Sequence, residues 1–162
     1  MTRKAGGNFG GRVREATADD LDFVLALMPR LNECDLPAWR DTGLMTRIDC
    51  ELVEKNLRER PEGTAVLVAE EDGARLGFVH LFTAVDHYSG EAQGYVSDLV
   101  VAPEGEGRGV GAALMAASEE WARGLGYRVL WLYVFSSNGR ARRLYERLGY
   151  GEDFIRCVKQ LN

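Results

Sequence analysis

The chain has 162 residues, of which 46% are hydrophobic and 28% are charged. This length and composition fit one globular domain with a hydrophobic core and exclude a disordered chain. Its 20 Lys and Arg stand against 25 Asp and Glu, which gives a net charge of -5. That charge argues against a general nucleic-acid binder and against binding to an anionic membrane, because both need an excess of basic residues.

The cysteines and the apolar runs indicate a soluble protein in a reducing compartment. Cys34, Cys50 and Cys157 are far apart and form no C-x-x-C pair of the kind that binds zinc or does redox chemistry. Residues 1–14 have no apolar stretch, so we expect no signal peptide. The longest apolar run, residues 129–135, is far shorter than the roughly 20 residues of a membrane span. We therefore predict a cytoplasmic protein with reduced cysteines, no metal and no membrane partner.

The order of the predicted elements indicates one mixed α/β domain. We expect residues 1–11 to be a flexible leader and residues 12–162 to be a single domain without repeats or linkers. The elements follow as strand, two helices, three strands, helix, strand, helix and strand.

Two helices are predicted near the start of this domain. Thr17-x-x-Asp20 has the spacing of a capping box, and apolar residues at helical intervals follow it. Pro29 is expected to kink or end this helix. A second helix is predicted to start at the capping box of residues 46–49 and to end before Pro61.

Alternating and β-branched residues then predict an antiparallel meander. Its strands are residues 64–69, 75–84 and 95–101, and a Glu-Glu-Asp-Gly turn joins the first two.

The last third of the chain predicts two helices, residues 110–125 and 139–148, each followed by a strand. Residues 127–135 are hydrophobic on both faces, which is typical of a central strand covered by helices and not of an edge. A last strand is expected at about residues 153–160.

The glycine-rich segment of residues 105–112 joins the third meander strand to the next helix. Glycine permits positive φ and has no Cβ, so successive N–H groups can point into one concavity. The first turn of the helix adds unpaired N–H donors and the positive end of its dipole. The segment therefore predicts an anion site, most naturally for a phosphate or pyrophosphate. The alternative is a flexible loop before a glycine-rich helix start.

Two nucleotide motifs fit this segment poorly. Gly107-x-Gly109-x-x-Ala112 matches the dinucleotide fingerprint, but residues 127–135 lack the acid that would hold a ribose. A P-loop needs Gly-Lys-Ser/Thr where this chain has residues 110–112, Val-Gly-Ala.

A second motif lies downstream, Asn138-x-x-Ala141-x-x-x-Tyr145-x-x-x-Gly149-Tyr150. Together with the glycine-rich segment it resembles the GNAT superfamily of N-acetyltransferases. The acetyl-CoA loop pattern of that family, Gln/Arg-x-x-Gly-x-Gly/Ala, is matched by residues 106–111 except that Glu106 takes the first position. A carboxylate there would repel a pyrophosphate unless it turned to solvent, with Arg108 as a counter-charge.

The resemblance covers nearly the whole chain and implies a single-domain α/β (α+β) fold. It implies a central mixed, mostly antiparallel sheet of about six to seven strands flanked by about four helices. The main chain of the third meander strand would bind the pantetheine arm of acetyl-CoA, and the loop amides would bind its pyrophosphate. The implied cofactor-binding residues are Leu99, Val100, Val101, Gly107, Arg108, Gly109, Val110, Gly111, Ala112, Asn138 and Arg142.

Two residues are candidates for proton transfer. By the resemblance, Tyr145 is the general acid that protonates the departing sulfur, and its alternative is a core tyrosine. Asp98 is a carboxylate inside an apolar strand, so burial would raise its pKa and suit it to act as general base. Its alternative is a structural acid that orders a strand bulge.

The acceptor pocket of this family is usually built between the first two helices. Trp39 and the acidic run Glu33, Cys34 and Asp35 lie there and are candidate substrate contacts, with an exposed acidic loop as the alternative. His80 and His87 have no partner at metal spacing, and we expect surface or core roles for both.

The resemblance implies an N-acetyltransferase that moves an acetyl group from acetyl-CoA to a primary amine of a small molecule or peptide. The amine would attack directly in a ternary complex, and a homodimer is expected from the family. The alternative is a non-catalytic acyl-CoA sensor on the same fold. Residues 106–147 hold seven Arg and four Glu, so we expect this stretch to suit an anionic cofactor and the acidic remainder a cationic amine.

Overall fold

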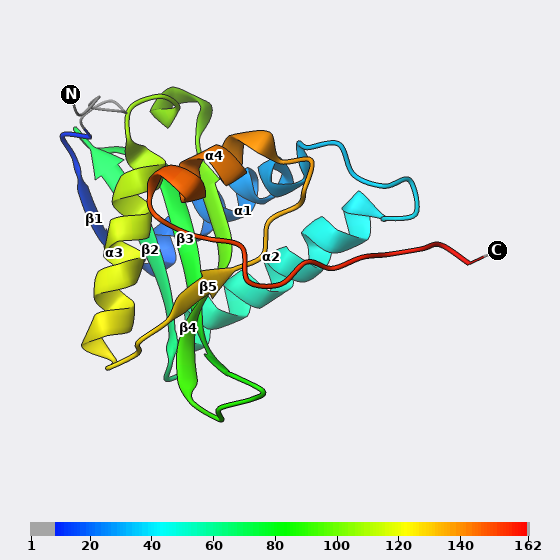
Figure 1. The fold of residues 1–162 in the computed structure, drawn as a ribbon. Helices are drawn as coiled ribbons and strands as arrows, with labels where there is room; N and C mark the ends of the chain where they lie inside the picture. Colours follow the sequence, from blue (N-terminus) through cyan, green and yellow to red (C-terminus); the bar gives the residue numbers. More distant parts are fainter. Residues whose placement is uncertain (1–8, 162) are drawn as a thin grey trace, which may run out of the picture.

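The fold is built on a five-stranded sheet with the order β1-β2-β3-β4-β5 (Figure 1). The computed structural model describes residues 9–161. The first four strands are antiparallel neighbours, and β5 runs parallel to β4. The strands are β1 (Arg12–Glu15), β2 (Thr64–Glu71), β3 (Ala74–Val85), β4 (Ala92–Val101) and β5 (Leu130–Leu132).

Helices cover both faces of the sheet, because side chains along each strand alternate between the two faces. The helices are α1 (Leu21–Leu27), α2 (Thr42–Glu59), α3 (Val110–Gly124) and α4 (Gly139–Arg147), with 3-10 turns at Ala18–Asp20, Met28–Asn32 and Pro103–Gly105. One core cluster packs Val24 of α1 and Val53 of α2 against Phe78. The other packs Leu114 of α3 against Val79, with α4 at its margin. None of the described helices combines the length and the apolar character needed to cross a membrane.

The local signals at the helix ends are mostly confirmed. The capping box of Thr17 and Asp20 is formed, and α1 passes into a 3-10 turn at Pro29. The second helix starts earlier than predicted, because Asp41 caps it by accepting a hydrogen bond from the N–H of Leu44 at 2.9 Å. The predicted box at residues 46–49 therefore lies inside α2.

The predicted hairpin is confirmed, with β2 and β3 joined at Asp72 and Gly73. Both turn residues have positive φ, 51° and 78°, as a tight two-residue turn requires. Strand β2 extends two residues beyond its predicted end at Ala69, to Glu71.

Two predictions about the last third of the chain are wrong. Only Leu130–Leu132 of the predicted strand at residues 127–135 is a strand, and it lies at the edge of the sheet. Residues 153–160 form no strand, so the described sheet has five strands rather than six to seven. The apolar pattern of a strand indicates whether its two faces are covered by other elements. It does not indicate whether the strand has a hydrogen-bonded neighbour on each side, so it cannot tell a central strand from an edge strand. The predicted leader falls largely on residues 1–8, outside the described residues.

Candidate functional site

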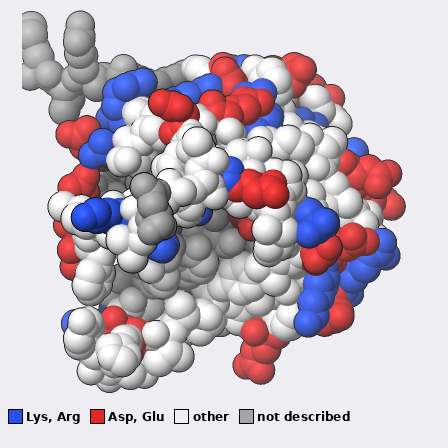
Figure 2. All heavy atoms as spheres, turned by 90° about the vertical axis from the view of Figure 1, so that its right-hand side faces the viewer, with Lys and Arg blue, Asp and Glu red and all other residues white. Residues whose placement is uncertain are grey.

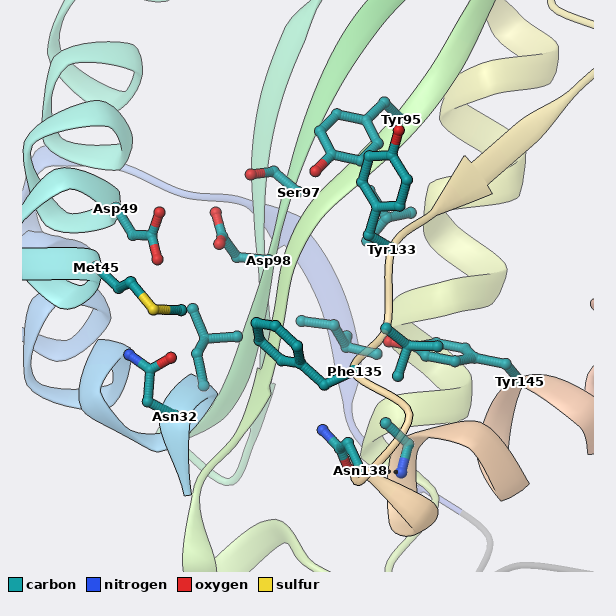
Figure 3. Close-up of a pocket in the computed structure, with 15 residues that line it drawn as sticks. Asn32, Met45, Asp49, Tyr95, Ser97, Asp98, Tyr133, Phe135, Asn138 and Tyr145 are labelled. Atoms are coloured by element: carbon teal, nitrogen blue, oxygen red, sulfur yellow. Dashed lines mark hydrogen bonds between the residues drawn. The ribbon is translucent and has the colours of Figure 1, made fainter. Parts of the chain in front are cut away.

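A cleft opens where β4 and the chain after β5 separate. Their pairing stops at Val96 and Leu132, whereas β4 continues to Val101. The cleft has a volume of about 230 Å³, enough for reacting groups rather than for a whole coenzyme (Figure 3). It is lined by Leu31, Asn32, Met45, Asp49, Tyr95, Val96, Ser97, Asp98, Leu99, Tyr133, Val134, Phe135, Asn138, Ala141 and Tyr145.

A β-bulge places Asp98 at the wall of this cleft. In the β3–β4 register His80 pairs with Asp98 and Leu81 with Val96, so Ser97 is the extra residue. The bulge lets consecutive residues of β4 reach the cleft, where a regular strand would present only alternate ones. Asp98 is 5% exposed, so its carboxylate is held almost entirely out of bulk water.

Asp98 is held by a buried chain of polar side chains. His80 is fully buried, and its Nδ1 lies 2.9 Å from Oδ2 of Asp98. On the other side of the ring, Nδ2 of Asn56 lies 2.9 Å from Nε2 of His80. Both ring nitrogens therefore have partners, and every member of the chain is satisfied.

A second carboxylate, that of Asp49 on α2, faces Asp98 across the cleft (Figure 3). Burial raises the pKa of Asp49 to about 6, and the negative charge of Asp98 adds to the shift. Asp49 is therefore mostly ionised at pH 7. Two facing carboxylates give this end of the cleft a strong preference for a cation.

Tyr145 lies on the opposite side of the cleft, on α4 (Figure 3). Burial raises its pKa to about 12, so the phenol keeps its proton at neutral pH and can donate a hydrogen bond. Tyr95 and Tyr133 form an aromatic wall between the two sides, with ring centroids 6.1 Å apart.

Asn138 caps α4 and also lines the cleft. Its Oδ1 accepts a hydrogen bond from the N–H of Ala141 at 3.1 Å, which fixes the side chain (Figure 3). The Nδ2 of Asn138 remains able to donate to a bound group.

The glycine-rich loop has the predicted features of an anion site. Gly107 and Gly109 have φ values of 72° and 83°, and Gly109 is the N-cap of α3. Within the part of the chain that the structure describes, no backbone carbonyl accepts from the N–H of either glycine. Helix geometry leaves the N–H groups of residues 110–112 without partners as well. These donors fit a pyrophosphate.

Close packing explains one further glycine of this loop. A Cβ on Gly111 would lie 3.1 Å from Leu144, so the absence of a side chain lets α3 approach α4.

Glu106 is not turned to solvent as expected. Its Oε1 lies 2.6 Å from Nη2 of Arg30 and 2.6 Å from Nη1 of Arg140. The Arg140 hydrogen bond is the main reason that the pKa of Glu106 is lowered. The carboxylate is therefore neutralised by two cations from separate elements.

Several arginines of residues 106–147 form ion pairs, so they are less available to an anionic cofactor than the sequence suggests. Arg108 is ion-paired with Glu71, and Arg142 contacts Glu152 at 2.7 Å. Arg123 and Arg140 are paired as well. Figure 2 shows basic and acidic side chains interspersed around a largely uncharged hollow, rather than one positive face.

The structure brings some of the predicted site residues together and leaves others apart. Asp98, Leu99, Asn138 and Tyr145 share the cleft. Val100 is buried and Val101 half-buried at the end of β4, directly before the glycine-rich loop. The acceptor candidates Glu33, Cys34, Asp35 and Trp39 do not line the cleft.

The corresponding wall of the cleft is formed instead by Asn32, Met45 and Asp49, which the sequence did not single out as site residues. The sequence signal for Met45 and Asp49 was their spacing of four residues, which places both on one face of α2. His80, expected in a surface or core role, lies in the core but supports Asp98. Among the described residues, no group of three or more His, Cys, Asp or Glu is placed to hold a metal.

Comparison with known proteins places this architecture in a family. Residues 25–150 match the model of the acetyltransferase (GNAT) family. The aminoalkylphosphonate N-acetyltransferase of Salmonella typhimurium is 30% identical over 92% of this chain and 90% of its own. The uncharacterized N-acetyltransferase YhfO of Bacillus subtilis is 34% identical over 65% of this chain and 72% of its own.

A solved structure has the same fold. AAC(6')-Iy, in complex with the bisubstrate analog CoA-S-monomethyl-acetylneamine, aligns with a TM-score of 0.70 over 94% of this chain and 98% of its own, at 21% identity.

Proposed function

The chain belongs to the acetyltransferase (GNAT) family and is an acetyl-CoA-dependent acyltransferase. From this premise we propose that it moves the acetyl group of acetyl-CoA to a primary amine of a small molecule or peptide. The observation that carries the proposal is the placement of Asp98 and Tyr145 on opposite walls of one cleft.

The donor side of the proposal rests on the free N–H groups of the loop and of the first turn of α3. The main-chain N–H groups of Gly107, Gly109, Val110, Gly111 and Ala112 would hold the pyrophosphate. The N–H of Arg108 contributes less, because it donates to the carbonyl of Gly105 at 3.4 Å. The main chain of Leu99, Val100 and Val101 would hold the pantetheine arm, and Asn138 would donate to it. Arg142 is the weakest member of this set, because its guanidinium is engaged by Glu152.

The acceptor side rests on the two facing carboxylates. Asp49 and Asp98 would attract an ammonium ion into a cleft whose lining also includes the aromatic rings of Tyr95, Tyr133 and Phe135. The relatives with a named substrate support this substrate class, since the Salmonella protein is an aminoalkylphosphonate N-acetyltransferase and AAC(6')-Iy was solved with an acetylneamine analog.

The proton on the amine is the larger obstacle to reaction. An alkylammonium with a pKa near 10.4 costs about 4–5 kcal/mol to deprotonate at pH 7. Asp98 is proposed as the general base, directly or through a water, with His80 and Asn56 holding its carboxylate. None of the three cysteines lines the cleft, which supports direct attack by the amine without an acyl-enzyme.

Departure of the sulfur is the smaller obstacle to reaction. A thiol has a pKa near 8.5, roughly three units below that of Tyr145, so complete proton transfer from the phenol is uphill. Tyr145 is therefore proposed to act first as a hydrogen-bond donor to the sulfur as charge develops there.

Thiol release from acetyl-CoA tests the proposal. Purified protein is incubated with acetyl-CoA and a panel of aminoalkylphosphonates, aminoglycosides, polyamines, amino acids and peptides. We expect release with at least one cationic primary amine. Binding of acetyl-CoA without release for any amine would favour the non-catalytic acyl-CoA sensor. A cytoplasmic location and a homodimer are further parts of the proposal.

A further inference from the structure

An arginine without an ionic partner packs on the wall of the cleft. Arg40 belongs to the loop between the 3-10 turn at Met28–Asn32 and α2, and its side chain is half-buried. Its Cζ lies over the ring of Trp39, 4.6 Å from the ring centroid, and over the ring of Phe135 at 5.0 Å. Because Phe135 lines the cleft, the guanidinium lies directly beside the site (Figure 3).

The acids close to Arg40 in the sequence are engaged elsewhere. Glu33 pairs with Arg30 at 3.6 Å. Asp41 caps α2 by accepting the N–H of Leu44. Among residues 9–161, no carboxylate forms an ion pair with Arg40 and no acceptor forms a hydrogen bond with its side chain. The same residues hold no buried side-chain nitrogen without a partner, so the N–H groups of Arg40 face solvent.

The two ring contacts leave the hydrogen-bonding capacity of Arg40 unused. A cation–π contact uses the positive charge and does not occupy the N–H groups. The guanidinium presents five N–H donors in a rigid fork that matches a carboxylate, a phosphate or a phosphonate. Packing on the rings of Trp39 and Phe135 also restricts the side chain before a ligand arrives, which lowers the entropy cost of binding. Arg40 is therefore suited to hold an anionic group next to the cleft.

The cleft has the opposite charge within reach of a small molecule. Asp49 and Asp98, which would hold the ammonium ion, line the same cleft as Phe135. Asp49 lies about 12 Å along the axis of α2 from its cap at Asp41, at roughly 1.5 Å per residue. The Arg40 side chain covers part of this distance, because it extends to Phe135. A short molecule can therefore reach both the carboxylates and the guanidinium.

We propose that Arg40 determines acceptor specificity by binding an acidic group of the acceptor. The acceptor is then a small zwitterion, a primary amine that carries a carboxylate, phosphate or phosphonate a few bonds away. This inference rests on the proposed function, because it needs the amine to react beside Asp98. The carboxylates of Asp49 and Asp98 attract the ammonium and repel the acidic group, so the molecule would bind in one direction.

Matched acceptors test the inference on the wild-type protein. β-Alanine is compared with β-alaninamide, and aminoethylphosphonate with propylamine, by following thiol release from acetyl-CoA. We expect kcat/KM, corrected for the fraction of neutral amine, to be about tenfold or more higher for the acidic member, mainly through KM. The preference should shrink as salt screens the charges.

Two results of this comparison are distinct. Equal values for both members of each pair would contradict the inference and leave the proposed function standing. Absence of thiol release with every amine would contradict both.

Variants of Arg40 assign the preference to this side chain. Arg40→Gln should lower the preference for the acidic member by about tenfold, whereas Arg40→Lys keeps the charge without the fork and should retain part of it. Arg47→Gln is the matched control, because Arg47 is an exposed arginine of α2 that does not line the cleft. The preference should persist in this control.

A purely structural role of Arg40 predicts a different result. If Arg40 only fixed its loop against Phe135, Arg40→Gln would lower kcat/KM equally for both members of a pair, and the inference would be overturned. Circular dichroism checks the fold of each variant. The wild-type comparison decides the inference even if Arg40→Gln fails to fold.

Discussion

His80 Nδ1 lies 2.9 Å from Oδ2 of Asp98, and both side chains are buried between β3 and β4 beside the cleft. The amide of Asn56 fixes the direction of this hydrogen bond. When Asn56 Nδ2 donates to Nε2 of His80, Nε2 is an acceptor, so Nδ1 carries the proton and donates to Asp98. Asp98 is thus held in one orientation by the His80 ring and keeps acceptor capacity for a group in the cleft.

Asp98→Asn tests whether this carboxylate is the base. An amide cannot take the proton of the amine, so we expect turnover to fall by about a hundredfold or more, with loss of the acidic limb of the pH–rate profile. Steady-state kinetics from pH 5 to 9 measures both effects. Asp20→Asn is a control, because Asp20 is also a buried acid but lies outside the cleft. A variant that loses stability but keeps the wild-type pH profile would assign Asp98 to ordering the bulge.

Tyr145→Phe removes the proposed donor to sulfur and keeps the packing of the ring. We expect turnover to fall about ten- to a hundredfold, the lower part of the usual range for such groups. Tyr150→Phe is the matched control, since its ring lies 6.0 Å from that of Tyr145 and its hydroxyl contacts Glu119 instead of the cleft. Equal rates for wild type and Tyr145→Phe with a good amine would exclude the role.

The residues predicted from the sequence are those fixed by local spacing. Gly107 and Gly109 take positive φ for reasons that are local to the loop, and Asn138 and Tyr145 lie on one short helix. The pairing of His80 with Asp98 could not be found this way. It depends on the register of β3 and β4 and on an extra residue at Ser97, which leave no spacing signal.

Long-range packing also decides which acidic residues line the cleft. The sequence offered the acidic run around Cys34, but the cleft is lined by Asp49, which α2 brings opposite β4. Likewise, a last strand is expected at about residues 153–160, and only the structure shows that this segment pairs with no strand of the described chain.

Glu106→Gln should tighten acetyl-CoA binding about three- to tenfold. The substitution removes a negative charge beside the phosphate loop and frees Arg30 and Arg140 to attract the anion. Calorimetry at low and high salt measures the change, which should shrink as salt screens the charges. Glu104→Gln removes the same charge from an exposed position nearby and is the control. If Glu106→Gln bound acetyl-CoA more weakly than the wild type, the ion pairs of Glu106 with Arg30 and Arg140 would be needed to shape the loop.

Asp20→Asn should destabilise the protein by about 3 kcal/mol at pH 7, because it removes the buried anion between Arg14 and Arg75 and leaves these two partly exposed cations uncompensated. Asp20 is fully buried and receives hydrogen bonds from Arg14 at 2.7 Å and from Arg75 at 2.6 Å. Chiefly through Arg14, these contacts hold the pKa of Asp20 well below its usual range. The contribution is therefore present above the ordinary pKa near 3.8 and is lost as pH falls below it. Urea unfolding of both proteins should give a difference that narrows below pH 4, and a difference independent of pH would contradict this account.

Asp49→Asn should bind the amine more weakly and yet be more stable. Burial and the charge of Asp98 raise the pKa of Asp49 from 3.8 to about 6, so the folded state holds this proton more tightly than the unfolded state does. Stability therefore falls as pH rises from about 4 to 6, and the substitution removes that loss. We expect a gain of roughly 1–2 kcal/mol at pH 7, after allowing for solvent screening, and none at pH 4.

The same charge is proposed to hold the substrate ammonium. For the wild type, KM for the amine should rise as pH falls through about 6, because Asp49 then becomes neutral. In Asp49→Asn, KM at pH 7 should be about tenfold higher, equivalent to about 1.4 kcal/mol, and should not depend on pH in this range. Asp49→Glu keeps the charge and should restore most of the binding. If KM is unchanged while stability rises, the ionisation of Asp49 costs stability without serving the acceptor, and the ammonium must be held by Asp98 alone.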